Sequence, residues 1–223
     1  MFKGRGPAYG GHGGATDESL ATLLKAGWFG RLRVLNLSGN AIGDKGLKAL
    51  AAHPVAKSLR QLGLGDNAFG MKTFAALVKR GAFPALTALD LHSHNKRASN
   101  SEDLAAFLSA LRLPHLRHLN LENWPLGNAG AKALAANPSL ANLARLDVSK
   151  CHIGDPGAKA IFASPHLQNL VQLHMAGNSI KSGADALADP SVMPRLTECW
   201  LGHNKVPEAS AKTFKRDGMD LSV

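Results

Sequence analysis

The stretch LRVLNLSGNAIGDKGLKALA, residues 32–51, decides the fold. In its first half Leu35 and Leu37 alternate with other residues, which is typical of a short strand with one buried face. Its second half starts with the turn sequence GDKG at 43–46 and continues with small and apolar residues that favour a helix. One strand followed by one helix is therefore the predicted unit.

This unit recurs along the chain. The Leu-x-x-Leu-x-Leu pattern begins at residues 32, 59, 86, 116, 143, 170 and 196, allowing Val, Met or Cys at a few leucine positions. The ninth position of a copy is often asparagine, and in one copy it is Cys151. An asparagine amide there satisfies backbone groups where the chain leaves the strand, and stacked copies form a ladder. We therefore expect parallel strands, stacked in sequence order, with helices outside them.

The pattern resembles the leucine-rich repeat, L-x-x-L-x-L-x-x-N/C-x-L. The period of about 27 residues and the helical second half resemble the ribonuclease-inhibitor-like class. The runs NAGAKALAANPSL at 128–140 and IGDPGAKAIFASPHL at 153–167 are similar to bacterial repeat proteins of that class. The resemblance covers residues 15 to about 216. It implies an α/β solenoid, a right-handed horseshoe with a parallel sheet on the concave side and helices on the convex side.

The repeats also divide the chain. Residues 1–14 are predicted to be a flexible Gly-rich tail and residues 15–223 the solenoid, with seven repeats after an N-terminal half repeat at 15–31. The half repeat carries a helix at about 17–26 without a good strand before it. It is either a cap or part of a longer array. The third and fourth repeats depart most from the pattern, at 92–100 and at Trp124-Pro125, which is either a local sign of function or a tolerated loop insertion.

Composition excludes several classes of protein. Apolar residues make up 45% and charged residues 19%, as in ordinary globular proteins. No run of 18 apolar residues is present, so we expect no membrane span, and the absence of a signal-peptide pattern favours a cytoplasmic location. The two cysteines, Cys151 and Cys199, are predicted to be buried structural thiols. They lie two repeats apart, which at typical strand spacing is about 10 Å and too far for a disulfide.

The net charge is +10 and the pI is about 9.9. An acidic partner, nucleic acid included, is compatible with this charge. The basic residues are nevertheless spread along the whole sequence rather than clustered with aromatics, which favours a solvated basic surface.

No catalytic signature is present: there is no P-loop, nucleophile elbow, HExxH or paired CxxC motif. His92 and His94 form an H-x-H pair, but His92 is expected on the concave side and His94 in the buried ladder, so they face apart. We therefore expect no enzyme activity, no metal site and no cofactor.

The strand positions that face outward predict a concave surface with a polar, mixed-charge centre. Trp200 is an exposed aromatic residue there, and exposed Trp and Arg are typical interface anchors. The candidate partner-binding residues are Asp90, His92, His118, Asn120, Glu122, Arg145, Asp147, His174 and Trp200.

These observations favour a monomeric, non-enzymatic scaffold that binds a protein partner on its concave face. Two alternatives remain open. Because the ribonuclease-inhibitor-like class includes GTPase-activating proteins and enzyme inhibitors, the resemblance allows a regulator of an enzyme in trans. The net charge allows a nucleic-acid-binding surface, whose affinity would fall steeply with salt. The lack of stacked aromatics in the sequence argues against recognition of single strands.

Overall fold

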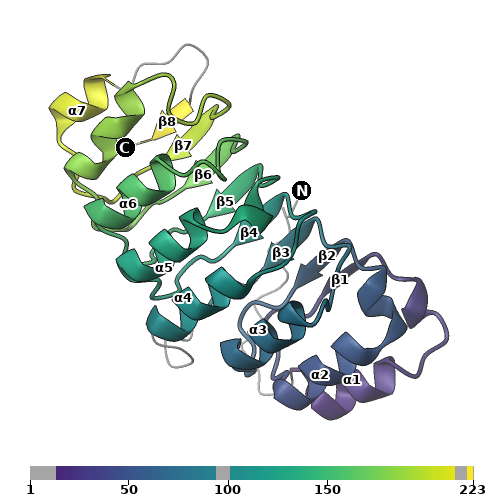
Figure 1. The fold of residues 1–223 in the computed structure, drawn as a ribbon. Helices are drawn as coiled ribbons and strands as arrows, with labels where there is room; N and C mark the ends of the chain where they lie inside the picture. The colour runs from purple at the N-terminus through teal and green to yellow at the C-terminus, as the bar shows by residue number, and fades with distance from the viewer. Residues whose placement is uncertain (1–13, 94–100, 214–219, 223) are drawn as a thin grey trace.

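The computed structural model describes residues 14–93, 101–213 and 220–222. Its centre is one parallel sheet of eight strands, each three residues long, in the order β1 to β8 (Figure 1). The strands are β1 Val34–Asn36, β2 Gln61–Gly63, β3 Ala88–Asp90, β4 His118–Asn120, β5 Arg145–Asp147, β6 Gln172–His174, β7 Glu198–Trp200 and β8 Asp220–Ser222. The order of the strands along the sheet is their order in the sequence, as predicted for stacked repeats.

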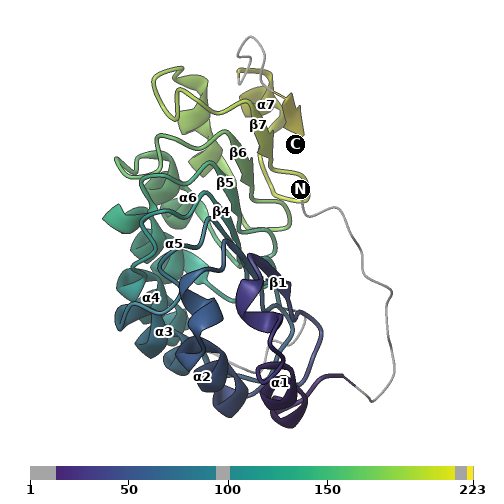
Figure 2. The same ribbon diagram turned by 90° about the vertical axis from the view of Figure 1, so that its right-hand side faces the viewer.

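Helices cover one face of this sheet and leave the other face open (Figure 2). The α-helices are α1 Asp17–Leu23, α2 Asp44–Ala52, α3 Met71–Lys79, α4 Ser101–Ala110, α5 Gly127–Ala135, α6 Asp155–Phe162 and α7 Glu208–Thr213. Short 3-10 helices are η1 Phe29–Arg31, η2 Pro54–Lys57, η3 Pro138–Leu140 and η4 Ser182–Ala188. The sixth repeat thus has a 3-10 helix, η4, where its neighbours have an α-helix. The predicted α/β solenoid is confirmed.

The core is a stack of leucine layers. The central residue of each strand pairs in register with that of the next, from Leu35 through Leu62, Leu89, Leu119, Leu146 and Leu173 to Cys199. From Leu62 onward the side chains of this row are at most 2% exposed. Because each layer buries its apolar surface against its neighbours, a single repeat has no complete core of its own, and stacking stabilises the array.

A ladder of side chains closes the end of each strand, as the asparagine pattern predicts. Asn178 Nδ2 donates to Val148 O at 2.9 Å and to Met175 O at 2.8 Å. Its Oδ1 accepts from the backbone nitrogens of Cys151 and Ile153. Asn40, Asn67 and Asn204 make similar contacts with the preceding repeat.

Two other residues occupy the ladder in place of asparagine. The Cys151 thiol donates to Leu121 O at 3.1 Å, and burial raises its pKa to about 12. Trp124 is nearly buried, and its indole nitrogen donates to Leu91 O, one repeat back. Trp124 therefore keeps the donor half of the ladder, where the sequence suggested a break. Both Cys151 and Cys199 are free and buried.

A second ladder joins the helix starts and explains the Gly-Asp-x-Gly turn. Asp155 Oδ1 accepts from Lys181 N at 2.6 Å and from Gly183 N at 2.9 Å in the next repeat. One repeat earlier, Asn128 Oδ1 accepts in the same way from Gly154 N and Gly157 N. Each acidic or amide residue thus caps the start of the next repeat's helical segment.

The structure of the N-terminal end of the array agrees with the sequence prediction more closely than that of the C-terminal end. The half repeat begins with α1, which Thr16 caps, and Thr16 forms a parallel bridge with Ala41. At the other end β8 extends the sheet by a strand beyond the seven expected.

The Gly-rich tail, His94 and most of the irregular segment 92–100 lie outside the described residues. Within the described ranges no helix is long and apolar enough to cross a membrane.

Candidate functional site

The open face of the sheet is lined by the first and third residues of each strand. The third residue is Asn or Asp in β1, β3, β4 and β5, and its side-chain oxygen accepts a hydrogen bond from the backbone nitrogen two residues later. Asp90, Asn120 and Asp147 therefore help to shape the strand ends as well as facing the concave side. This fixes their side chains and makes the surface rigid.

One closely connected part of this surface surrounds His174. Its Nδ1 lies 3.5 Å from Asp147 Oδ2, and its Nε2 lies 3.2 Å from Glu198 Oε1. Its ring stacks on Trp200 with centroids 4.3 Å apart and an interplanar angle of 8°. Gln172 Nε2 donates to Glu198 Oε2 at 2.6 Å. We call His174, Asp147, Glu198, Gln172 and Trp200 the His174 cluster.

Charge explains how the His174 cluster titrates. The hydrogen bond to Asp147 raises the pKa of His174 above its ordinary value against the opposing effect of burial, and Glu198 adds to the rise. Burial alone would raise the pKa of Asp147, but hydrogen bonds from His174 and Ser149 lower it. The cluster therefore favours an imidazolium held between two carboxylates, with both ring nitrogens donating.

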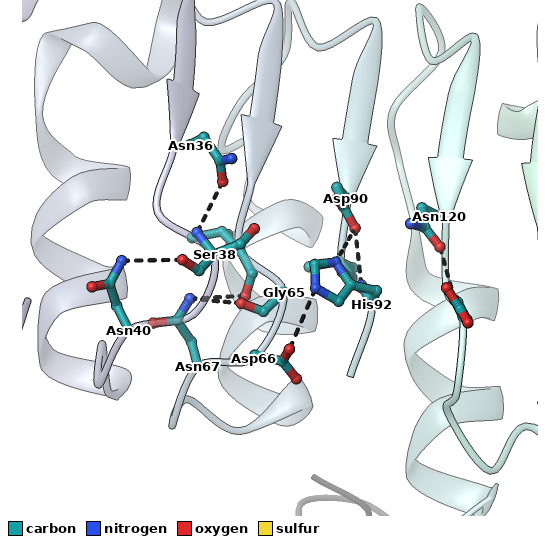
Figure 3. Close-up of polar contacts among 12 residues, drawn as sticks. Asn36, Ser38, Asn40, Gly65, Asp66, Asn67, Asp90, His92 and Asn120 are labelled. Carbon is teal, nitrogen blue, oxygen red and sulfur yellow. Dashed lines mark hydrogen bonds and ion pairs between the residues drawn. The ribbon is translucent and has the colours of Figure 1, made fainter. Parts of the chain in front are cut away.

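A second histidine is held in a similar way near the N-terminal end of the sheet. His92 Nδ1 lies 2.8 Å from Asp90 Oδ1, and Nε2 lies 3.4 Å from Asp66 Oδ2 (Figure 3). The hydrogen bond to Asp90 raises the pKa of His92. A Cβ atom on Gly65 would lie only 2.4 Å from Nδ1 of this ring, so glycine at that position makes room for the histidine.

Between the two histidines the surface is less tightly connected. Glu122 Oε1 accepts from Lys150 Nζ at 2.7 Å, and the lysine side chain is mostly exposed. His118 and Arg145 are register partners on β4 and β5. Burial, followed by the nearby Arg145 charge, lowers the pKa of His118. His118 is thus favoured as a neutral ring beside an exposed guanidinium.

Comparison with protein families agrees with this architecture. A family model described as a leucine-rich repeat matches residues 32–51, 112–135 and 139–162. The matched segments combine the strand leucines with the helix that follows, as the structure does throughout. The chain is a leucine-rich-repeat protein. No curated protein matches its sequence significantly.

Two internalins from Listeria monocytogenes are among the solved structures similar to this leucine-rich-repeat protein. For the internalin InlF, the sequence identity is 17% and the TM-score 0.50, and the match covers 92% of this chain and 62% of that one. For internalin C2 the identity is 18% and the TM-score 0.51, with coverage of 93% and 84%. This chain therefore spans less than two thirds of the length of InlF. Identities this low show a shared fold alone.

The structure places all nine predicted residues on the strands or strand ends of the open face, but it divides them into groups. Asp147, His174 and Trp200 form one group, Asp90 and His92 a second, and the rest lie between. The sequence prediction left out Asp66, Lys150, Gln172 and Glu198. Each of these four residues occupies a repeat position that lies beside a predicted residue of the neighbouring repeat. Adjacent strands bring such positions side by side, so this position is the signal by which the sequence could have identified them.

Several charged groups on this face bind one another. Within residues 14–93, 101–213 and 220–222, no group of three or more His, Cys, Asp or Glu side chains has the geometry to hold a metal ion. His92 and His174 each lie between two carboxylates. Chemically this is a preordered polar surface with one exposed aromatic, Trp200, which is 44% exposed.

Proposed function

We propose that this leucine-rich-repeat protein is a non-enzymatic scaffold that binds a protein partner on its concave face. Repeats of this kind form a rigid, extended surface whose outward residues vary freely while the leucine layers keep the fold. The proposed contact surface, which we call the concave patch, consists of Asp90, His92, His118, Asn120, Glu122, Arg145, Asp147, His174 and Trp200.

The His174 cluster is the observation that carries this proposal. Trp200 is large, exposed and held flat against His174, which itself lies between two carboxylates. Tryptophan is enriched among residues that dominate binding energy at protein interfaces. A side chain fixed before binding loses less conformational entropy when a partner arrives. An ordered, exposed Trp at the C-terminal end of a polar face is therefore suited to be an anchor.

The proposal is non-enzymatic because His92 and His174 are each engaged with carboxylates and the cysteines are buried. Each ring nitrogen of His174 faces a carboxylate, and neither cysteine is an accessible nucleophile: both are buried, and burial raises the pKa of Cys151 to about 12. The proposal also includes a monomer in a reducing, cytoplasmic compartment, with which two free thiols are compatible.

The test compares capture of a partner by three forms of the full chain. Wild type, a concave variant (Trp200→Ala with Arg145→Glu) and a convex variant (Lys132→Glu) are each immobilised and exposed to extract of the source cell. Lys132 is exposed on α5, and Trp200 and Arg145 are exposed on the open face. We expect a protein that wild type and the convex variant retain and the concave variant loses.

The interpretation depends on the concave variant being folded, which its circular dichroism and thermal unfolding will establish. A partner retained equally by all three forms overturns binding on the concave face. If the concave variant retains the partner and the convex variant loses it, the interface lies on the helices instead. A crosslinking residue placed at Asn120 that reacts with the same partner would support the proposal independently.

A further inference from the structure

The arginines of this protein, although scattered in sequence, gather along one edge of the sheet. Every arginine in the described part of the chain lies between the end of a helical segment and the first residue of the next strand, and every one is exposed. They are Arg31, Arg33, Arg60, Arg80, Arg112, Arg117, Arg145 and Arg195. Because all strands are parallel and in register, these segments meet at the edge where the strands begin (Figure 1). We call this set the arginine rim.

Backbone hydrogen bonds fix the neighbours along this rim. Arg60 N donates to Arg33 O at 2.7 Å. Thr87 N donates to Arg60 O, Arg117 N donates to Thr87 O, and Arg145 N donates to Arg117 O. The four arginines in this series thus lie on consecutive or near-consecutive repeats. At a strand spacing of about 4.8 Å, the edge from β1 to β7 is about 29 Å long.

The arginine rim carries almost no compensating charge. The six segments that precede β1 to β6 contain no Asp or Glu; the one that precedes β7 contains Asp189 and ends at Glu198. None of the ion pairs among described residues involves an arginine. Where these guanidinium groups donate hydrogen bonds, the acceptors are uncharged, as for Arg33, Arg112 and Arg195. Most carboxylates lie instead at the strand ends and helix starts, on the opposite edge.

Arginine is segregated more completely than lysine. Lys25 and Lys57 lie in the segments before β1 and β2, but most described lysines, such as Lys48, Lys132 and Lys150, lie on the helices or on the opposite edge. Arginine presents a planar fork of donors that matches phosphate oxygens and also stacks on flat rings, whereas lysine is a point charge. An aromatic side chain lies at the N-terminal end of the same rim: Trp28, just before η1, is 56% exposed.

We propose that the arginine rim binds the phosphodiester backbone of a single-stranded nucleic acid. A row of exposed arginines without carboxylate partners, whose backbones lie one or two strand spacings apart, fits a flexible, extended polyanion. Single-strand sites combine such a row with an aromatic stacking platform, here Trp28. This surface shares only Arg145 with the concave patch. The rim variant described below leaves Arg145 and Trp200 unchanged, so its result does not depend on the concave patch.

The experiment measures binding of the full chain to a fluorescein-labelled 20-nucleotide single strand by anisotropy, between 50 and 200 mM salt. Neutralising about four phosphates predicts a slope of log K against log salt of about −3. The rim variant is Arg60→Gln with Arg117→Gln. Its matched control is Lys48→Gln with Lys132→Gln, which removes the same charge from exposed positions on α2 and α5.

We expect the rim variant to bind about tenfold more weakly or worse, with a slope less negative by about 1.4, and the control to remain close to wild type. Trp28→Ala should weaken single-strand binding about fivefold or more and leave any duplex binding unchanged. Equal losses in the rim and control variants, or no binding by wild type, would overturn the proposal. So would tighter binding of a 20-base-pair duplex, or equal binding of polyglutamate, which identifies an acidic protein as the occupant.

Discussion

The ring of His174 lies parallel to that of Trp200, 4.3 Å away, while its two nitrogens face Asp147 and Glu198. The histidine thus joins three consecutive strands, because Asp147 is on β5 and the other two residues are on β7. A change in its protonation alters the charge directly beneath the exposed Trp200 ring. The state of His174 is therefore a property that a partner on the concave patch would sense.

The first prediction concerns the pKa of His174. Because the hydrogen bond to Asp147 is the main cause of its rise, Asp147→Asn should lower that pKa toward the ordinary value. NMR titration of the imidazole carbon-bound protons measures the change directly. Asp185→Asn, an exposed position on η4, is the matched control and should leave the His174 midpoint in place. An unchanged midpoint in Asp147→Asn would contradict this account of the cluster.

The second prediction concerns stability and pH. The folded-state pKa values of His92 and His174 are raised, so the stability these residues contribute is fully present below the unfolded histidine pKa, about 6.5, and is lost as pH rises through the folded values. His118, whose pKa is lowered, acts in the opposite direction. The Tm of the wild type should therefore decrease, through these two residues, as pH rises. Replacing His92 and His174 together by Gln should remove that decrease.

Thermal unfolding of wild type and of the double variant, followed from pH 5.5 to 8.5, measures this difference. The two curves of Tm against pH should be furthest apart at the acidic end and approach one another at the alkaline end. His166→Gln, in the loop before β6, serves as the control. A constant separation across the whole range would mean that the histidines stabilise the fold by packing alone.

The repeat period makes most of the fold predictable from the sequence. Once Leu35, Leu62 and Leu89 are placed in successive layers, strand order, register and the outward-facing positions follow, and with them all nine residues of the concave patch. Side-chain pairing within the patch does not follow, since the contact of Lys150 with Glu122 depends on rotamers and exact strand offsets. The sequence pattern also gave no sign of β8 beyond the seventh repeat.

The arginine rim shows why a cluster of residues in a solenoid is not visible in the linear sequence. Arg33 and Arg60 are 27 residues apart in the sequence, yet their backbones are hydrogen-bonded neighbours. A basic residue recurring once per repeat is spread evenly along the chain and concentrated along one edge in space. The sequence interpretation of a dispersed basic surface therefore differs from the structure for arginine, although it describes the lysines well. Trp124 is a similar case, because its indole can replace an asparagine donor only when the ladder geometry is known.

The third prediction tests the asparagine ladder. Asn178→Ala removes the donated bonds to Val148 O and Met175 O and a longer one, 3.5 Å, to Ala176 O. It also removes the two bonds that Asn178 accepts from Cys151 N and Ile153 N. Buried polar groups left unsatisfied make the loss larger than that of a surface bond, so we expect destabilisation by about 3 kcal/mol. Urea unfolding measures it. Asn142→Ala, an exposed residue with one bond to Pro114 O, should cost under about 1 kcal/mol; equal losses would argue against the ladder.

The fourth prediction tests the contact between helix starts, where Gly157 closely approaches the preceding repeat. A Cβ atom added there would lie 2.8 Å from Asn128 Oδ1, 2.8 Å from the Ile153 side chain and 2.9 Å from Ala131 Cβ. Neither Ala131 nor Ile153 can move freely, because both are fully buried. Gly157→Ala should therefore destabilise the protein by about 1–3 kcal/mol through overpacking, although alanine has the higher helix propensity. The control is Gly30→Ala, whose Cβ meets nothing within 4 Å and should leave urea unfolding nearly unchanged. If Gly157→Ala instead stabilises the protein, helix propensity outweighs close packing at this junction, and the glycine of the Gly-Asp-x-Gly turn is not required by the approach of the neighbouring repeat.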